Sequence, residues 1–331
     1  MASERHPRLS PNGHQDGRAA ASFSAMHMVN HAADLAPYAG AALVPTMGAL
    51  HDGHASLIRQ ARAHADGAAK NSMPVVVTIF VNPTQFAANE DLSRYPRTLD
   101  ADLAIARAAG ADAVFVPSVE TIYPRGVDAA QREAAAWDLP PAATQPRLED
   151  AFRPSHFGGV CLVVARLFEL CRPQRAFFGE KDWQQWRVIA QMVDRERVRR
   201  ERRFDDLELT PCATVREVDG LAMSSRNRYL DTAARARATA LWRSIGLARA
   251  VAPRSMASIA ETERAMQRLL EENGFSVDYA VIRDGASLLP PAAMIDCSSL
   301  RVLIAVRADG VRLIDNALLF ADAAVSRGIP S

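Results

Sequence analysis

The chain has 331 residues, of which 49% are hydrophobic and 23% charged, and its formal net charge is +1. This composition is ordinary for a globular protein and predicts two domains, while the near-zero charge argues against a general nucleic-acid binder. No apolar run reaches membrane-spanning length, and no signal-peptide pattern is present. We therefore expect a cytoplasmic protein without membrane or nucleic-acid partners. The cysteines lack a C-x-x-C pair and are typical of reduced thiols: Cys161, Cys171, Cys212 and Cys297.

Residues 1–25 are rich in Pro, Gly, Ser, Ala and His without an apolar period, and we expect a disordered tail there. The first regular segment is a short apolar run at residues 43–44, which we expect Pro45 to end. A turn at residues 47–48 and an inward-facing apolar pair at 57–58 follow. This pattern predicts a strand, a tight turn and a helix.

Two histidines lie at the predicted start of that helix. Asp52 is a plausible N-cap, which would place His51 and His54 around free backbone N–H groups and the positive end of the helix dipole, a location that favours anions. Surface histidines or part of a zinc site are the alternatives, but zinc would need further ligands and none stand at matching spacing. The classical phosphate loop and G-x-G-x-x-G are both absent, so a histidine-based polyphosphate site remains the hypothesis.

The next segment is an unbroken β-branched run at residues 74–81, typical of a central strand in a parallel sheet. Asn82 and Gln85 follow its carboxyl end, where ligands bind in open α/β sheets. Helical and strand patterns continue to alternate, giving five strands in all and predicting a Rossmann-like parallel sheet with helices on both faces. The later helices are expected at about 98–109, 159–171 and 182–192, and the strands at 113–116, 175–178 and 207–213.

A second strand-to-helix turn contains Lys181, whose ammonium can meet a phosphate as a point charge. A solvated lysine at a helix start is the alternative. Either Gln184 or Gln185, on the following helix, could face the same crevice. The basic run at 195–203 could suggest nucleic acid, but acidic residues interrupt it and no aromatics interleave, so we expect a solvated extension.

A turn at Gly220 precedes a predicted loop in which Ser224, Ser225 and Arg226 offer two hydroxyls and a guanidinium that can clamp a phosphate or carboxylate. The remaining chain reads as an α+β domain, with helices at 232–252 and 255–272 followed by strands at 278–283, 301–306 and 311–316. We therefore expect two domains after the tail, at 26–214 and 215–325.

Six motifs in this order closely resemble the pantothenate synthetase family across about residues 40–320. The resemblance implies a nucleotidyltransferase-type Rossmann domain with an H-x-G-H site, a smaller C-terminal lid domain and a homodimer. It also implies condensation of pantoate with β-alanine, using ATP and releasing AMP and pyrophosphate. The motifs are Pro45-Thr-Met-Gly-Ala-Leu-His-Asp-Gly-His54, Phe80-Val-Asn-Pro-Thr-Gln-Phe86, Arg94-Tyr-Pro-Arg-Thr98, Arg153-Pro-Ser-His-Phe157, Phe178-Gly-Glu-Lys-Asp-Trp-Gln-Gln185 and Met223-Ser-Ser-Arg-Asn227.

The resemblance also implies roles for individual residues. His54 becomes the proton donor, and His51, Lys181 and Arg226 complete the catalytic set. Gln85 and Gln185 hold pantoate, with Gln85 also near the β-alanine position, and Asn82 stays a substrate-site candidate. Mg²⁺ is expected to bridge the triphosphate oxygens, with no protein ligand identified. The ATP-binding set is Met47, Gly48, Ala49, Leu50, His51, Asp52, Gly53, His54, Gly179, Glu180, Lys181, Asp182, Val215, Met223, Ser224, Ser225 and Arg226.

The chain departs from the family pattern in two places. Residues 127–153 are Pro- and Ala-rich where the family carries a strand and a Gly-containing turn, and Asp150 and Phe152 replace small residues. The Arg-rich run at 195–203 looks longer than the family's connection. Two rival functions stay open: a cytidylyl- or adenylyltransferase of the same superfamily, which would need more basic residues for a second phosphate, and a degenerate nucleotide binder without turnover.

Overall fold

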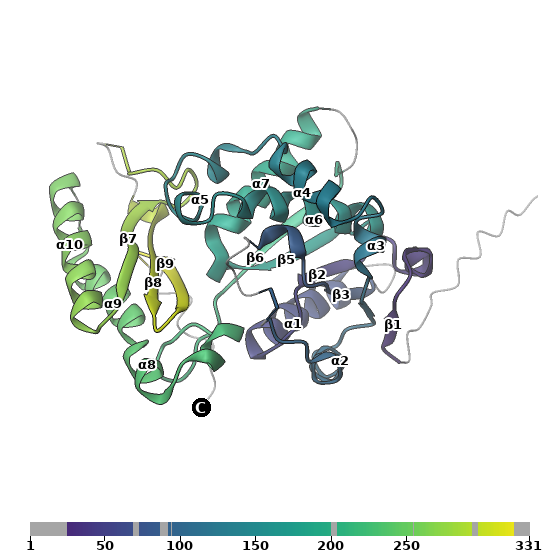
Figure 1. Ribbon diagram of the computed structural model, residues 1–331, viewed down its shortest axis with the longest axis horizontal. Helices are drawn as coiled ribbons and strands as arrows, with labels where there is room; N and C mark the ends of the chain where they lie inside the picture. Colours follow the sequence, from purple (N-terminus) through teal and green to yellow (C-terminus); the bar gives the residue numbers. More distant parts are fainter. Residues whose placement is uncertain are drawn as a thin grey trace, which may run out of the picture.

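The computed structural model describes residues 25–68, 73–86, 92–93, 95–199, 204–253, 255–292 and 297–320. Its larger part is a parallel sheet in the order β1-β4-β3-β2-β5-β6, and a separate antiparallel sheet, β7-β8-β9, follows (Figure 1). This confirms the predicted α/β fold with a C-terminal α+β part. The parallel strands are β1 (His27–Val29), β2 (Ala42–Thr46), β3 (Val75–Ile79), β4 (Ala113–Phe115), β5 (Arg175–Gly179) and β6 (Glu208–Cys212).

The sheet has one strand more than predicted. The extra strand, β1, is three residues long, pairs only with β4 at the sheet edge and buries only its last residue. Such a strand leaves no alternating pattern in the sequence, because alternation needs a longer half-buried segment. Of the predicted tail, residues 1–24 lie outside the described residues.

Pro45 lies inside β2 and does not end it, which corrects the expected boundary. In a strand, successive residues direct their backbone groups to opposite neighbours. Ala42 N–H bonds to the β3 side, so Pro45 points to the β5 side. There the β2–β5 pairing stops at Leu43, so the missing N–H of Pro45 breaks no ladder bond.

Apolar helices cover both faces of the parallel sheet, as predicted. Ala42 and Val44 of β2 pack with residues of α1 and α2, whereas Leu43, between them, packs with α6 and α7 on the opposite face. This explains why the central strands read as continuous apolar runs. The helices are α1 (Asp52–Gly67), α2 (Leu99–Ala108), α3 (Val119–Ile122), α4 (Val127–Ala135), α5 (Glu149–Phe152), α6 (His156–Cys171) and α7 (Trp183–Val198), with 3₁₀ turns at Ala32–Tyr38, Pro83–Gln85, Pro141–Ala143 and Glu180–Asp182.

Helix α7 continues six residues beyond its predicted end at 192, which changes the interpretation of the basic run. Arg195 donates to the carbonyl of Leu139 at 2.9 Å, and Arg197 to that of Phe204 at 3.1 Å. Glu196 between them is buried. The expected solvated extension is therefore only partly right. Arg195 and Arg197 are half-buried and bind carbonyls of neighbouring loops, whereas Val198 and Arg199 are exposed. Residues 200–203 lie outside the described residues.

The C-terminal sheet consists of β7 (Ser276–Asp284), β8 (Leu300–Ala308) and β9 (Val311–Leu318). Along β8, Val302 and Ile304 pack with α9 and α10, whereas Leu303 packs with the core of the parallel-sheet part. The sheet thus lies between its own helices and the rest of the molecule (Figure 1). The helices are α8 (Thr232–Arg237), α9 (Ala240–Val251) and α10 (Met256–Glu272), with 3₁₀ turns at Ser225–Tyr229 and Cys297–Ser299.

The helix predicted at 232–252 is in fact two helices, α8 and α9. Thr239 lies at the break, and its hydroxyl donates to the carbonyl of Ala236 at 2.9 Å. Such a side-chain bond competes with the helical backbone pattern. The apolar period continues across this break, so the sequence pattern predicted one uninterrupted helix.

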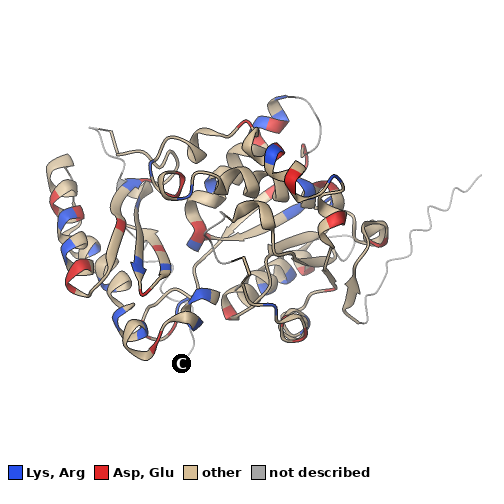
Figure 2. Ribbon diagram, viewed as in Figure 1, with Lys and Arg blue, Asp and Glu red and all other residues tan. Residues whose placement is uncertain are grey.

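Charges of both signs alternate along the helices and over both parts of the molecule in the view of Figure 2. Within the described part of the chain, no helix combines the length and apolarity that a membrane span requires. Three cysteines, Cys161, Cys171 and Cys212, are free and buried. The side chain of Cys297 lies outside the described residues.

Candidate active site

The first candidate element is the turn that joins β2 to α1. Gly48 and Ala49 both have positive φ, +81° and +51°. The backbone N–H groups of Ala49 and Leu50 donate to the carboxylate of Asp102 at 3.0 and 2.8 Å, and Asp102 is buried on α2. A Cβ added at Gly48 would lie 3.0 Å from the same carboxylate. Asp102 therefore fixes a turn that needs two unusual backbone conformations.

Helix α1 begins differently from the prediction, because His51 is its N-cap and Asp52 is the first helical residue. The Nδ1 atom of His51 accepts from Gly53 N–H at 3.1 Å, and Nδ1 of His54 accepts from His51 N–H at 3.3 Å. This reciprocal arrangement is a capping box made from imidazoles. Asp52 was the more obvious N-cap from residue preference alone. The ring centroids of the two histidines lie 4.2 Å apart.

Both histidines are neutral at ordinary pH. Desolvation, followed by the charge of Lys181, lowers the pKa of His51 to about 4. Desolvation and then the neighbouring His51 and Lys181 lower the pKa of His54 to about 3. Since Nδ1 of each neutral ring accepts a backbone hydrogen, the proton must be on Nε2. Each ring thus offers one Nε2–H donor, which suits a phosphate oxygen.

The second element is the turn after β5, which pairs with β2 in the sheet. Lys181 lies in the 3₁₀ turn that precedes α7, and its ammonium is 3.7 Å from the Asp182 carboxylate. The carboxylate of Glu180, in contrast, accepts a hydrogen bond from Arg301 of the C-terminal sheet at 3.1 Å. The parallel neighbours β2 and β5 therefore bring the histidine turn and the lysine turn to one edge of the sheet.

The third element is the segment from Val215 to Arg226. Met223 N–H donates to the carbonyl of Val215 at 3.0 Å, which closes the segment into a loop around Gly220, whose φ is +90°. Ser224 caps the following 3₁₀ turn, and its hydroxyl accepts from Arg226 N–H at 3.3 Å. This cap orients the Ser-Ser-Arg run toward the two turns described above.

These elements enclose a cavity of about 230 Å³ that contains most of the predicted site. Five predicted ATP contacts, Gly48, Ala49, Leu50, Asp52 and Glu180, do not line it. Ala49 and Leu50 are buried, and their N–H groups are already bonded to Asp102. The predicted residues that do line it are Met47, His51, Gly53, His54, Asn82, Gln85, Gly179, Lys181, Asp182, Gln185, Val215, Met223, Ser224, Ser225 and Arg226.

Gln85 lies in this cavity with its amide already oriented. Asn82 donates to Gln85 Oε1 at 3.2 Å and to the carbonyl of Gly159 at 3.1 Å. Its own Oδ1 accepts from Tyr123 OH at 2.7 Å and from Thr84. All these hydrogen-bond partners of Asn82 are protein atoms. The hydrogen bond from Asn82 orients the amide of Gln85, whose Nε2 contacts the Met47 sulfur and faces the cavity.

The two glutamines of α7 separate as the helix period requires. Gln185 lines the cavity, whereas Gln184 is buried and bonds to Ala142 O at 2.8 Å and to the Asp150 carboxylate at 2.9 Å. The Pro- and Ala-rich segment at 127–153 is thus anchored to the helix that follows Lys181. The sequence left the structure of this segment uncertain. It forms α4, a 3₁₀ turn and α5 in place of the strand that the resemblance implied.

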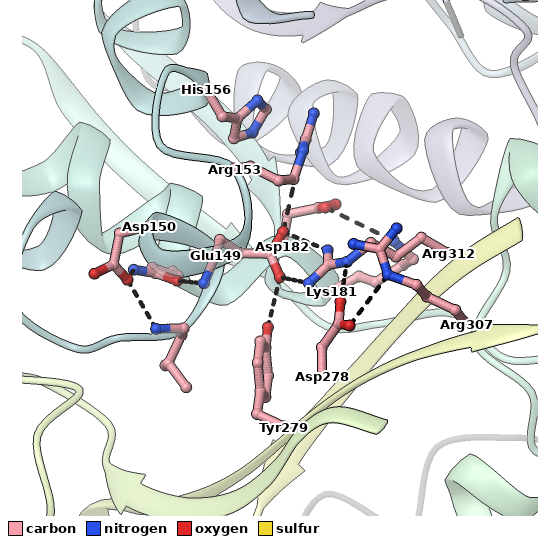
Figure 3. Close-up of polar contacts among 12 residues, drawn as sticks. Glu149, Asp150, Arg153, His156, Lys181, Asp182, Asp278, Tyr279, Arg307 and Arg312 are labelled. Carbon is pink, nitrogen blue, oxygen red and sulfur yellow. Dashed lines mark hydrogen bonds and ion pairs between the residues drawn. The ribbon is translucent and has the colours of Figure 1, made fainter. Parts of the chain in front are cut away.

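A second cavity, of about 460 Å³, adjoins the first, and the two share Lys181, Asp182, Gln185, Ser224 and Arg226. Figure 3 shows its wall, where the Glu149 carboxylate lies between Arg312 and Tyr279. Arg312 donates to it at 2.6 and 2.8 Å and Tyr279 at 2.6 Å. Burial raises the pKa of Glu149, but the hydrogen bonds and charge of Arg312, together with the Tyr279 hydrogen bond and the Arg153 charge, outweigh it and lower the pKa to about 2. This ion pair connects α5 to the C-terminal sheet.

Two residues that the site uses had no role predicted from the sequence. Asp102 lies 53 positions from the turn that it fixes, and an acidic residue in the first turn of a helix is too common to be a signal. Tyr95 belongs to the motif at 94–98 but received no role there. It lines the 230 Å³ cavity, and its side chain is hydrogen-bonded to Ser225. Only the folded chain brings Tyr95 to the cavity and Asp102 to the turn after β2.

A Rossmann-like sheet whose strand ends gather neutral histidine donors, a lysine and a Ser-Ser-Arg loop defines an enzyme that binds a phosphate-bearing ligand. The pantoate-beta-alanine ligase family model matches residues 21–318. The chain is 45% identical to a pantothenate synthetase from Nocardioides sp. over 277 residues, covering 83% of this chain and 77% of that protein. The chain therefore belongs to the pantoate–β-alanine ligase family.

Solved structures of enzymes named for this activity resemble the fold of this chain. The crystal structure of pantothenate synthetase from Thermus thermophilus has a TM-score of 0.76 at 38% identity, covering 89% of this chain and 100% of that one. A pantoate-beta-alanine ligase from Francisella tularensis, complexed with beta-gamma ATP and beta-alanine, has a TM-score of 0.66 at 28% identity, covering 89% and 98%.

Proposed function

We propose that the protein condenses pantoate with β-alanine, consuming ATP and releasing AMP and pyrophosphate through a pantoyl-adenylate intermediate. Family membership supports the reaction. The observation that supports the same reaction for this chain is a single cavity lined both by groups that can donate hydrogen bonds to phosphate and by neutral amides. The cavity is lined by His51, His54 and Lys181 and also by Gln85 and Gln185. A hydroxy acid with one carboxylate suits such amides better than a phosphorylated substrate does.

In the first half-reaction, the pantoate carboxylate attacks the α-phosphorus of ATP and pyrophosphate leaves. The chain needs no covalent nucleophile for this step, only alignment of the reactants and stabilisation of charge on the phosphates. His51 and His54 donate through Nε2–H, and Lys181 and Arg226 supply positive charge. In the second half-reaction, the amine of β-alanine attacks the acyl carbonyl and AMP leaves.

We assign the substrate contacts to Gln85 and Gln185, with Gln85 also next to the amine. Asn82 acts through Gln85, because its donors and its acceptor bond inside the protein. The ATP contacts are the predicted residues that line the cavity. The C-terminal part, from residue 215 onward, acts as a lid over the parallel-sheet domain.

Mg²⁺ is proposed to enter with the triphosphate. Among the described residues no group of three or more His, Cys, Asp or Glu is arranged to hold a metal ion. The carboxylate of Asp182, which lines the cavity beside Lys181, is the protein group that fits a metal on the phosphates. Its chemistry there would be neutralisation of phosphate charge. A homodimer and a cytoplasmic location are proposed from the resemblance alone, and light scattering of the purified protein tests the dimer.

Isotope exchange tests the proposed reaction. Purified protein given Mg²⁺, ATP and pantoate should exchange labelled pyrophosphate into ATP without β-alanine, because the first half-reaction involves no amine. Adding β-alanine should then release AMP and pantothenate in equal amounts. β-Alanine alone should support no exchange.

Three results would contradict the proposal in different ways. Exchange that requires a phosphorylated substrate in place of pantoate would favour a nucleotidyltransferase. ATP binding without exchange under any substrate would favour a degenerate binder. Formation of ADP would place the attack at the γ-phosphorus and leave the proposed adenylate without a role.

A further inference from the structure

Two consecutive residues of β9, Asp315 and Asn316, contact two different segments of the proposed ATP site. Asn316 is buried, and its Nδ2 donates to the backbone carbonyls of Glu180 at 2.9 Å and Lys181 at 2.7 Å. One amide group of the C-terminal sheet therefore binds two carbonyls of the turn that carries Lys181.

Arg301 of β8 completes this contact. It donates to Asn316 Oδ1 and to the Glu180 carboxylate, and its guanidinium lies 3.5 Å from the centroid of the Trp183 ring. The donor to Oδ1 fixes which end of the Asn316 amide faces the turn, because the other end must then be the NH₂ group. The orientation of Asn316 is thus determined by its surroundings.

Asp315 contacts the other segment. Its buried carboxylate accepts a bidentate pair from Arg216 at 2.7 and 2.9 Å. Arg216 also donates to Gly220 O at 3.0 Å and lies 3.9 Å from the centroid of the Trp242 ring. Arg216 pairs with Ala222 in a β-bridge, immediately before Met223. A bidentate, stacked arginine fixes position as well as charge.

The two contacts are joined through the backbone of β9. Asn316 N–H donates to Asp315 Oδ1 at 2.7 Å, and Arg216 donates to the Asn316 carbonyl at 3.2 Å. The Lys181 turn and the loop ending at Arg226 lie far apart in the sequence, and this pair connects them to one rigid strand. Neither Asp315 nor Asn316 was singled out in the sequence.

We propose that Asp315 and Asn316 are positioning residues that set Lys181 and the Ser224–Arg226 run at their working distance across the ATP site. The inference rests on the proposed function, because Lys181 and Arg226 have their roles there. Lys181 reaches the cavity on a flexible stem, so the carbonyls held by Asn316 determine where that stem begins. Misplacement of a reacting group by about 1 Å can cost on the order of 10²-fold in rate.

Substitution of Asn316 tests the first contact. Asn316→Asp keeps the shape but turns an oxygen toward two carbonyls, so the Lys181 turn must move. We expect kcat for pantoate-dependent exchange to fall by about 10–100-fold, with a smaller change in KM for ATP. Asp315→Asn should act on the other segment and chiefly raise KM for ATP.

A double-mutant cycle separates positioning from a general structural role. If Asn316 acts through Lys181, then adding Asn316→Asp to Lys181→Ala should lower kcat by no more than about twofold further, because interacting sites are not additive. Full additivity in this cycle would overturn the proposal. Arg187→Gln is the matched control, since Arg187 donates across the same junction to Ala286 O at 2.9 Å without touching either segment. It should leave kcat and KM unchanged.

Hydrogen exchange of the substrate-free protein gives a readout that does not need turnover. Faster exchange at residues 180–183 in Asn316→Asp, with wild-type exchange there in Arg187→Gln, is expected. Asn316→Ala gives the same test if the Asp variant does not fold. Unchanged exchange at 180–183 in a folded Asn316 variant would overturn the inference. Absence of pantoate-dependent exchange in the wild-type protein would instead overturn the proposed function, and the hydrogen-exchange result would still decide the positioning claim.

Discussion

The molecule builds two similar strand-to-helix turns at neighbouring strands and fixes them by different means. The turn after β2 is fixed within its own domain, by the Asp102 carboxylate and by the histidine capping box. The turn after β5 is fixed from the C-terminal sheet, by Asn316 and Arg301. Both place a group that we propose binds phosphate in one cavity.

This difference separates a preformed half of the site from a dependent half. The histidine turn keeps its geometry wherever the C-terminal part lies, because its partners come from α1 and α2. The lysine turn keeps its geometry only while β9 is docked against it. Movement of the C-terminal part would therefore change the position of Lys181 and leave His51 and His54 in place.

The largest effect should come from the preformed half. His54→Ala removes one Nε2–H donor to the phosphates, and loss of one preorganised donor typically costs on the order of 10²–10³ in rate. The protein should stay folded, because Asp102 still fixes the turn. Steady-state kinetics and circular dichroism of the purified variant measure both. Normal turnover, or an unfolded variant, would contradict the preformed character of this half.

The second prediction concerns stability of the same turn. Asp102→Ala leaves the buried N–H groups of Ala49 and Leu50 without their acceptor, at a cost of about 1–3 kcal/mol for each group. Urea unfolding should show this loss, and hydrogen exchange should rise at residues 48–51 but not at 180–183.

Asp100→Ala is the control for this measurement, because Asp100 lies exposed in the first turn of the same helix. It should change the unfolding free energy little. If Asp102→Ala loosened both turns equally, the two halves of the site would not be independent.

The smallest effect, counted per pH unit, should be the pH dependence of stability. In the unfolded chain His54 binds a proton near its ordinary pKa of 6.5, whereas in the folded protein it stays neutral down to about pH 3. Between these values the unfolded state binds more protons, so the contribution is complete above pH 6.5 and declines as the pH falls. The slope approaches about 1.4 kcal/mol per pH unit for one such group.

Urea unfolding at several pH values between about 7 and 4 measures this slope. His54→Ala should show a shallower decline than the wild type, since it lacks the group. Equal slopes in both proteins would mean that His54 is not held neutral by the fold, and the Nε2–H assignment would then fail.

The sequence by itself determined much of this protein. Apolar runs such as Val75–Ile79 predict buried parallel strands because both faces are covered, and the prediction was confirmed. His51, His54, Lys181 and the Ser224–Arg226 run were found because each stands next to a local turn or helix signal. Their order and spacing also identified the family, which the comparisons confirm.

Only the tertiary structure decided how those residues are held. Asp102 lies 52–53 positions from the amides it binds, and Asn316 lies 135–136 positions from its carbonyls. No local sequence pattern predicts such contacts, because a single carboxylate or amide can bind a backbone group at any distance along the chain. The N-cap of α1 shows the same limit at short range. Residue preference favoured Asp52 as the N-cap. In the structure the imidazoles of His51 and His54 accept the N–H groups of Gly53 and His51 instead.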